Sequence, residues 1–257
     1  MVGSAPGSDF GRSARDYARH RPGFPRAFFD RVRAFNVGTP GQRVLDVGTG
    51  TGTLARGFAE RGADVVGLDP SAPMLAEAER LAVASTLSVR WVQASAEETG
   101  QSNHAFDVVS AGQCWHWFDR ARAAAEARRV LVPGGRLLIA HFSYLPEPGS
   151  VGAATEELVL RHNPAWTMAG SDGRHPRWEG DLRDAGFVDV ESFEFDLAVS
   201  FTHEGWRGRF RACNGVLALP NDGIDAFDAE LQSLLAARFP EPVVSRHRVF
   251  GVVGTSP

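Results

Sequence analysis

Three alternating glycines follow the apolar run at residues 43–47 and mark a candidate ligand-binding turn. Gly48, Gly50 and Gly52 stand where a predicted strand passes into a predicted helix. Because glycine lacks a Cβ and adopts left-handed backbone angles, such a turn lets a ligand approach the main chain closely. A second apolar run ends at Asp69, whose carboxylate can accept hydrogen bonds from both hydroxyls of a ribose. The two features together predict a nucleotide pocket.

The spacing of the glycines distinguishes between nucleotides. The dinucleotide fingerprint GxGxxG needs a glycine where this chain has Thr53, so NAD and FAD are disfavoured. Asp46 lies at the same strand end, where its charge would repel a pyrophosphate but attract a ligand that has an ammonium and a sulfonium group. S-adenosylmethionine has both groups. The alternative is a glycine-rich turn that only packs the sheet, and the acid at Asp69 argues against it.

Composition limits the possible functions. The net charge of −4 gives no overall attraction to phosphate backbones, so we do not expect nucleic acid as a partner. All 27 basic residues are arginine, and the absence of lysine excludes a P-loop lysine and Schiff-base chemistry. Cys114 and Cys213 lie too far apart in sequence, without neighbouring ligands, to indicate a disulfide framework or a zinc site.

Length and hydropathy indicate a globular protein. The chain has 257 residues, of which 43% are hydrophobic and 23% charged, and this is enough for one large α/β domain. No apolar stretch approaches the ~20 residues of a membrane helix, and the first residues lack the apolar core of a secretory signal. We therefore expect a cytoplasmic protein without a membrane partner.

Apolar periodicity predicts alternating strands and helices, which is typical of a parallel sheet flanked by helices. We expect strands at 43–47, 64–69, 88–93, 106–112, 135–142, 187–195 and 243–253. We expect helices at 51–61, 71–84, 119–130, 151–162, 176–185 and within 203–237, with a break at Pro220. Ser71 is a candidate N-cap of the second helix, and Pro133-Gly134-Gly135 is expected to separate the third helix from the strand that follows.

Residues 43–142 resemble the class I S-adenosylmethionine-dependent methyltransferases. The strings YARHRPGFP and QCWHWFD are similar to those of the small-molecule branch, methyltransferase type 11, which includes the trans-aconitate type. The resemblance implies a Rossmann-like, seven-stranded, mostly parallel sheet with helices on both faces. It also implies a single domain over 1–257, with an N-terminal helical lid at 1–35, a cofactor-binding core at 36–143, and a helical cap formed by insertions at 144–186 and 200–240.

The resemblance also implies the residues of the cofactor site. They are Tyr17, Arg21, Asp46, Gly48, Thr49, Gly50, Asp69, Pro70, Met74, Ser95, Ala96, Glu97 and Gln113. In this assignment the methionine part of the cofactor is surrounded by Asp46, Gly48 and Gly50. Its ribose is bound by Asp69, and its adenine lies against Pro70 and Met74. Arg21 would pair with the cofactor carboxylate, and Ser95 stands where relatives have an acid. As alternatives, Met74 is a core residue and Arg21 a surface arginine.

The string after the fourth strand and one arginine-rich helix are the candidate acceptor site. Trp115, Trp117 and Phe118 could form an apolar wall, and His116 could deprotonate a hydroxyl or phenol. Arg207 and Arg211 stand four residues apart and could hold a carboxylate. The alternatives are core tryptophans, a hydrogen-bonding histidine and a solvated helix face paired with Glu204.

The expected function is transfer of a methyl group from S-adenosylmethionine to a small organic acceptor, at the oxygen of a carboxylate, hydroxyl or phenol. In-line displacement at a sulfonium needs alignment and exclusion of water and requires no metal. Three alternatives stay open: an S-adenosylmethionine-binding protein without catalysis, a methyltransferase that acts on nucleic acid or protein, and a dehydrogenase. The acceptor's identity and the oligomeric state are not predicted.

Overall fold

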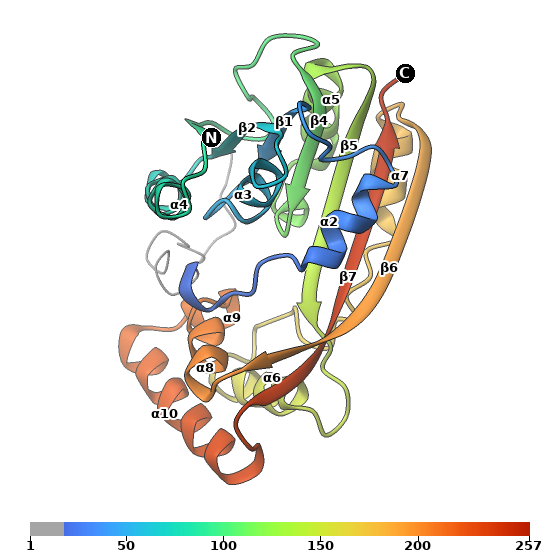
Figure 1. The fold of residues 1–257 in the computed structure, drawn as a ribbon. Helices are drawn as coiled ribbons and strands as arrows, with labels where there is room; N and C mark the ends of the chain where they lie inside the picture. The colour runs from blue at the N-terminus through green and yellow to red at the C-terminus, as the bar shows by residue number, and fades with distance from the viewer. Residues whose placement is uncertain (1–17) are drawn as a thin grey trace. The chain divides into compact units, whose positions relative to one another are not determined.

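The structure is a computed structural model that describes residues 18–257 (Figure 1). The described residues divide into two compact units. The first, here called the helical unit, contains 18–22, Ser143–Arg174 and Phe195–Arg248. The second, here called the sheet unit, contains Gly23–Phe142, His175–Glu194 and Val249–Pro257.

The described residues form a seven-stranded sheet with the order β3-β2-β1-β4-β5-β7-β6. The strands are β1 Arg43–Val47, β2 Asp64–Asp69, β3 Arg90–Gln93, β4 Phe106–Gly112, β5 Leu131–Tyr144, β6 Val188–Phe201 and β7 Val243–Thr255. Strands β1 to β5 pair in parallel. Strand β7 runs antiparallel to β5, since Gly134 N–H bonds to Ser256 O and Leu145 N–H bonds to Arg246 O. The expected Rossmann-like α/β sheet is confirmed.

Helices cover both faces of the sheet in the sheet unit. They are α2 Arg26–Arg33, α3 Thr53–Ala59, α4 Ala72–Ala84, α5 Arg120–Val130 and α7 Arg177–Asp184. Leu45 and Val47 of β1 pack in one core with side chains of α5 and α7. On the opposite face α3 lies close to β4, because a Cβ on Gly112 would lie 2.6 Å from Leu54. Alternation of side chains along each strand produces these two cores.

Beyond residues 18–22, the helical unit contains four helices. They are α6 Val151–His162, α8 His203–Arg211, α9 Asn214–Leu217 and α10 Asn221–Arg238. Large apolar side chains, among them Trp206, Phe210 and Phe227, pack into its core. The Thr202 hydroxyl caps α8 by accepting a hydrogen bond from Gly205 N–H at 2.9 Å. The predicted break at Pro220 lies between α9 and α10.

Some predicted boundaries were wrong, for reasons of backbone conformation. Helix α3 starts at Thr53 rather than 51, because Gly52 adopts a left-handed φ of +77° that no helical residue can have. Strand β5 starts at Leu131, because residues around Pro133 already join the ladder through Gly134 and Ser256. Strand β6 extends past 195 to Phe201. Ser71 occupies the N-cap of α4, but its side chain makes no capping bond within the described chain.

Across residues 18–257, the helices are all too short or too polar to cross a membrane.

Candidate functional site

All three glycines of the turn adopt the left-handed backbone conformation, but only one faces open space. Their φ angles are +61° at Gly48, +55° at Gly50 and +77° at Gly52. A Cβ on Gly48 would lie 2.8 Å from Phe118, and one on Gly52 would lie 2.6 Å from Trp91. At Gly50 an added Cβ would have no heavy atom of residues 18–257 within 4 Å. Gly50 is therefore where a ligand can lie against the main chain.

Asp69 joins the glycine turn to the end of β2. Its Oδ2 accepts a hydrogen bond from Gly50 N–H at 2.9 Å, and its Oδ1 accepts one from Ser71 N–H at 2.9 Å. Burial raises the pKa of Asp69, whereas these two hydrogen bonds lower it. Each carboxylate oxygen has a second lone pair, so Asp69 retains capacity for two more donors. A pair of adjacent hydroxyls, as in a ribose, matches that capacity.

Asp46 is buried beneath the glycine turn. Its side chain is only 2% exposed, and its oxygens accept hydrogen bonds of 2.6 Å from the hydroxyls of Thr49 and Ser110. Burial raises the pKa of Asp46 to about 6, and the two hydroxyls lower it. Asp46 and Thr49 therefore hold each other beneath the glycine turn instead of presenting polar atoms to a ligand. Any action of Asp46 on a cationic ligand goes through its charge.

Asp46 makes folding stability depend on pH. An acid whose pKa is raised on folding binds its proton more tightly in the folded chain, so stability falls as pH rises from about 4 to about 6. We expect Asp46→Asn to remove this part of the pH dependence, which is of the order of 1–3 kcal/mol. Urea unfolding of both proteins at pH 4, 5, 6 and 7 measures it.

Asp64 provides the matched control, since it is an exposed carboxylate at the start of β2. Asp64→Asn should retain the wild-type change of stability between pH 4 and 6. The interpretation of Asp46 fails if Asp46→Asn and the wild type lose the same free energy of unfolding over this range.

The residues predicted to contact adenine lie on or after β2 and β3, and two of them are core residues. Met74 is 5% exposed in α4 and Ala96 is 4% exposed, so both are packed inside the sheet unit. Pro70 is exposed, and its carbonyl accepts a hydrogen bond from Gln93 Nε2 at 3.0 Å. This bond joins the ends of β2 and β3, the edge at which ligands of parallel sheets bind.

Ser95 and Glu97 form part of a local turn and a helix start. Ser95 O accepts a hydrogen bond from Glu98 N–H at 3.3 Å. Glu97 Oε1 accepts one from Asp119 N–H at 2.9 Å, next to the start of α5. The Glu97 side chain therefore supports the segment that precedes α5.

Gln113 has a strained backbone directly after β4. Its φ is +66°, which is uncommon for a residue with a side chain and costs of the order of 1–3 kcal/mol. Gln113 N–H bonds to Ala140 O at 2.9 Å, and its Nε2 donates to Phe142 O. Its buried Oε1 has no hydrogen-bond partner among residues 18–257. Strain and an unsatisfied polar atom at a strand end are typical of a functional site.

The tryptophans that follow Gln113 have different environments. Trp115 is 1% exposed, lies in the core with α5 and α7, and donates from Nε1 to Asp181 at 3.0 Å. The core side of the sheet surrounds Trp115, and its place in an acceptor pocket stays a prediction. Trp117 is 38% exposed, and the His116 ring centroid lies 4.6 Å from that of Trp117. Phe118 lies beside Gly48, at the turn.

Cys114 is a structural residue. Its Sγ donates to Val47 O at 3.2 Å and is buried. Burial raises the pKa of the Cys114 thiol well above its usual value, and the nearby carboxylates of Asp46 and Asp69 raise it further. A thiol held in its neutral form is a poor nucleophile, so Cys114 packs the turn.

Arg207 and Arg211 do not form an open clamp. Both bond to Asp228, and Arg211 also reaches Glu204 at 2.6 Å. Carboxylates of the chain itself bind both guanidiniums, and the binding of a substrate carboxylate by Arg207 and Arg211 stays a prediction.

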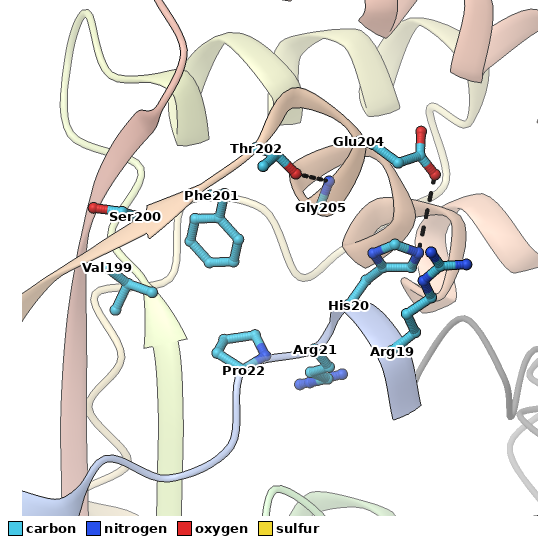
Figure 2. Close-up of a pocket in the computed structure, with 10 residues that line it drawn as sticks. All are labelled: Arg19, His20, Arg21, Pro22, Val199, Ser200, Phe201, Thr202, Glu204 and Gly205. Carbon is cyan, nitrogen blue, oxygen red and sulfur yellow. Dashed lines mark hydrogen bonds and ion pairs between the residues drawn. The ribbon is translucent and has the colours of Figure 1, made fainter.

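The N-terminal residues of the predicted cofactor site are only partly described. Tyr17 lies outside the described residues. Arg21 belongs to the helical unit and lines a cavity there (Figure 2).

Sequence reasoning missed Ser110, which holds Asp46 together with Thr49. Strand β4 is apolar apart from Asp107 at its start and Ser110, and Ser110 stands directly opposite Asp46 in the pairing of β1 with β4. A polar residue in the middle of a mostly apolar strand was the feature of the sequence that could have indicated a buried hydrogen bond at Ser110. Within residues 18–257, no group of three or more His, Cys, Asp or Glu is arranged to hold a metal ion.

Comparisons with known proteins agree with this geometry. A family model described as a methyltransferase domain matches residues 45–139. An uncharacterized methyltransferase of Mycobacterium tuberculosis is 41% identical over 128 residues, which are 50% of this chain and 49% of that protein. The chain thus spans about half the length of such curated relatives.

A longer match and a solved structure extend the comparison. The ubiquinone/menaquinone biosynthesis C-methyltransferase UbiE of Bordetella parapertussis is 33% identical over 201 residues, covering 68% of this chain and 76% of that protein. The structure of phosphoethanolamine N-methyltransferase 2 from Haemonchus contortus in complex with S-adenosyl-L-methionine has a TM-score of 0.57. That pair is 22% identical, and the match covers 97% of this chain and 57% of the other. The structural match supports the fold.

Proposed function

The chain belongs to the S-adenosylmethionine-dependent methyltransferase family, and from this premise we propose that it transfers a methyl group to a small organic acceptor. One observation carries the proposal: the open, left-handed Gly50 donates its N–H to Asp69, a carboxylate with two lone pairs to spare. This arrangement supports a nucleoside that lies along the turn with its ribose at Asp69. A pyrophosphate would meet the charge of Asp46 beneath the same turn.

The residues present fit S-adenosylmethionine as the methyl donor. Asp69 would bind the ribose, and Gly50 would allow the methionine part to approach the main chain. Bound there, the cofactor supplies the electrophilic methyl group. The protein's part is to align the acceptor and to exclude water, which accounts for most of the acceleration in an in-line displacement.

The residues that follow β4 form the proposed binding site for the methyl acceptor. Trp117 is the exposed tryptophan there, and with Phe118 it could flank an apolar acceptor. The centroid of the His116 ring lies 4.6 Å from that of Trp117 and 6.2 Å from that of His141. We propose His116 as the general base for a hydroxyl or phenol acceptor. A carboxylate acceptor is already ionised at neutral pH and needs no base.

His116→Gln should lower turnover with a hydroxyl or phenol acceptor by about 10²–10⁴-fold, the usual contribution of a general base. Affinity for S-adenosylmethionine should stay unchanged. The kcat of both proteins measured from pH 5 to pH 9, with cofactor affinity measured by calorimetry, tests the assignment. His162→Gln, on α6, serves as control. If turnover of His116→Gln survives across this range, His116 is not the base.

The methylated atom has two candidates. We propose oxygen, since a carboxylate, hydroxyl or phenol needs only the groups named above. Carbon is the second candidate, because a 33% identical relative bears the name C-methyltransferase. NMR of the purified product distinguishes an O-methyl from a C-methyl group by its proton chemical shift.

Formation of S-adenosylhomocysteine with a panel of phenols, alcohols and carboxylic acids tests the proposed function. Turnover with any member supports methyl transfer. Tight binding of S-adenosylmethionine without turnover on this panel would favour a binding protein without catalysis. Turnover only with RNA, DNA or protein would identify a macromolecular acceptor and contradict the proposal. Tighter binding of NADH than of S-adenosylmethionine would instead support the function of a dehydrogenase.

A further inference from the structure

The indole of Trp91 lies across a glycine of the neighbouring strand in the sheet unit. Trp91 on β3 is half-buried and stands opposite Gly67 on β2 in the parallel pairing. A Cβ on Gly67 would lie 2.5 Å from Cζ3 and 2.7 Å from Cε3 of the indole. Because Gly67 has no side chain, the six-membered ring of the indole can rest directly on the main chain of β2.

The same ring reaches the glycine turn. A Cβ on Gly52 would lie 2.6 Å from Cη2 and 3.2 Å from Cζ3 of Trp91. The Cβ of Ala78, a fully buried residue of α4, would lie 3.3 Å from that position. The indole therefore fills the space between β2, the turn and α4, as a close-packed interior requires.

The turn that Trp91 supports is short and tied to β2. Thr49 N–H bonds to Leu68 O at 2.9 Å, and Gly52 N–H bonds to Thr49 O at 2.8 Å. Gly50 lies inside this turn and donates its N–H to Asp69 at 2.9 Å. Only one residue separates Gly50 from Gly52, so a displacement of Gly52 also moves the Gly50 N–H.

The Thr49 hydroxyl lies on the same side of β2 as the indole. Thr49 Oγ1 would be 3.1 Å from a Cβ on Gly67, and it donates to Asp46 at 2.6 Å. A side chain at Gly67 would therefore press on the Trp91 ring and on the bond that holds the turn to Asp46. The absence of a side chain at Gly67 thus leaves room for both.

We propose that Trp91 is a positioning residue for the methyl donor. Through Gly52 it sets the position of the Gly50 N–H, and with it the geometry of the Gly50 and Asp69 pair. The inference rests on the proposed binding of S-adenosylmethionine at this turn. A displacement of about 1 Å at a site can cost about 10²-fold in function, so support from beneath the turn matters for the ligand. A tryptophan that only packs the core would change stability and leave affinity for the cofactor unchanged.

Replacing Gly67 with alanine should push the indole against the turn. We expect Gly67→Ala to weaken S-adenosylmethionine binding by about tenfold, measured by calorimetry on the full-length protein. Adding Trp91→Leu to this variant removes the ring that the new methyl group meets. The double variant should therefore bind at least about threefold more tightly than Gly67→Ala alone. Such a rescue shows that the effect passes through the indole.

Gly251 provides the matched control. It lies on β7, and a Cβ there would lie 2.4 Å from the ring of Phe193 on the neighbouring strand β6. Neither Gly251 nor Gly67 has a left-handed φ. Gly251→Ala should therefore lower the free energy of unfolding, measured in urea, while cofactor affinity keeps its wild-type value.

Amide hydrogen exchange follows the turn directly. Trp91→Leu alone leaves a gap beneath Gly52, so we expect weaker cofactor binding and an exchange of the Gly50 amide at least about tenfold faster, measured by NMR without ligand. Phe193→Leu is the control for loss of an aromatic ring and should leave the Gly50 amide unchanged. If Gly67→Ala does not fold by circular dichroism, the comparison of Trp91→Leu with Phe193→Leu decides.

Two results would overturn the inference. One is wild-type cofactor affinity in Gly67→Ala or, if that variant does not fold, in Trp91→Leu. The other is a double variant that binds no more tightly than Gly67→Ala. Failure of the wild type to bind S-adenosylmethionine contradicts the proposed function instead.

Discussion

Replacing Gly50 with alanine should weaken S-adenosylmethionine binding by about tenfold or more, which corresponds to about 1.4 kcal/mol. The residue has a φ of +55°, and a Cβ there would enter space in which residues 18–257 place no atom. The methyl group would therefore occupy the position proposed for the ligand. Strain from the left-handed backbone should separately lower the free energy of unfolding by about 1–2 kcal/mol.

Gly41 separates these two effects. It also has a left-handed φ, of +80°, and a Cβ there would likewise meet no heavy atom of the described chain within 4 Å. Gly41→Ala should therefore cost a similar free energy of unfolding while leaving cofactor affinity unchanged. Calorimetric titration and urea unfolding of both variants make the comparison. Equal cofactor affinities of the two variants would show that the ligand does not lie at Gly50.

Replacing Asp69 with alanine should weaken S-adenosylmethionine binding by about 1–3 kcal/mol, through loss of hydrogen bonds to a charged acceptor. At 25 °C this is about 5- to 150-fold in the dissociation constant. The change also leaves Gly50 N–H and Ser71 N–H without their acceptor, which loosens the turn. Asp69→Asn retains one acceptor oxygen and the side-chain shape, so we expect an intermediate loss.

Asp107 is the matched control for loss of a strand carboxylate. It bonds to Arg43 at the opposite, amino-terminal end of the parallel strands, at 2.7 Å. Asp107→Ala should lower stability and leave cofactor affinity at its wild-type value. The ribose assignment is contradicted if Asp69→Ala binds S-adenosylmethionine as tightly as Asp107→Ala does.

The glycine turn and the strands around it could be predicted from the sequence because they depend on local chemistry. Strands β1, β2 and β4 occupy the predicted residues, since each is a short apolar run that ends at a turn or a carboxylate. The left-handed angles of Gly48, Gly50 and Gly52 also follow from residue type.

The partners of buried polar groups could not be predicted, because they depend on strand register and on which helix face turns inward. Asp46 bonds to Ser110, 64 residues away, only because β1 and β4 pair with these residues opposite each other. On α8 the spacing drew attention to Arg207 and Arg211, yet the buried arginine is Arg209.

A crystal structure of the protein with S-adenosylhomocysteine would test the central claim most directly. Both ribose hydroxyls should lie within about 3 Å of the Asp69 oxygens, with the amino-acid part beside the main chain of Gly50. An empty turn in a crystal soaked with this ligand would contradict the account. A nucleoside bound elsewhere, or a diphosphate at the turn after soaking with NADH, would also contradict it.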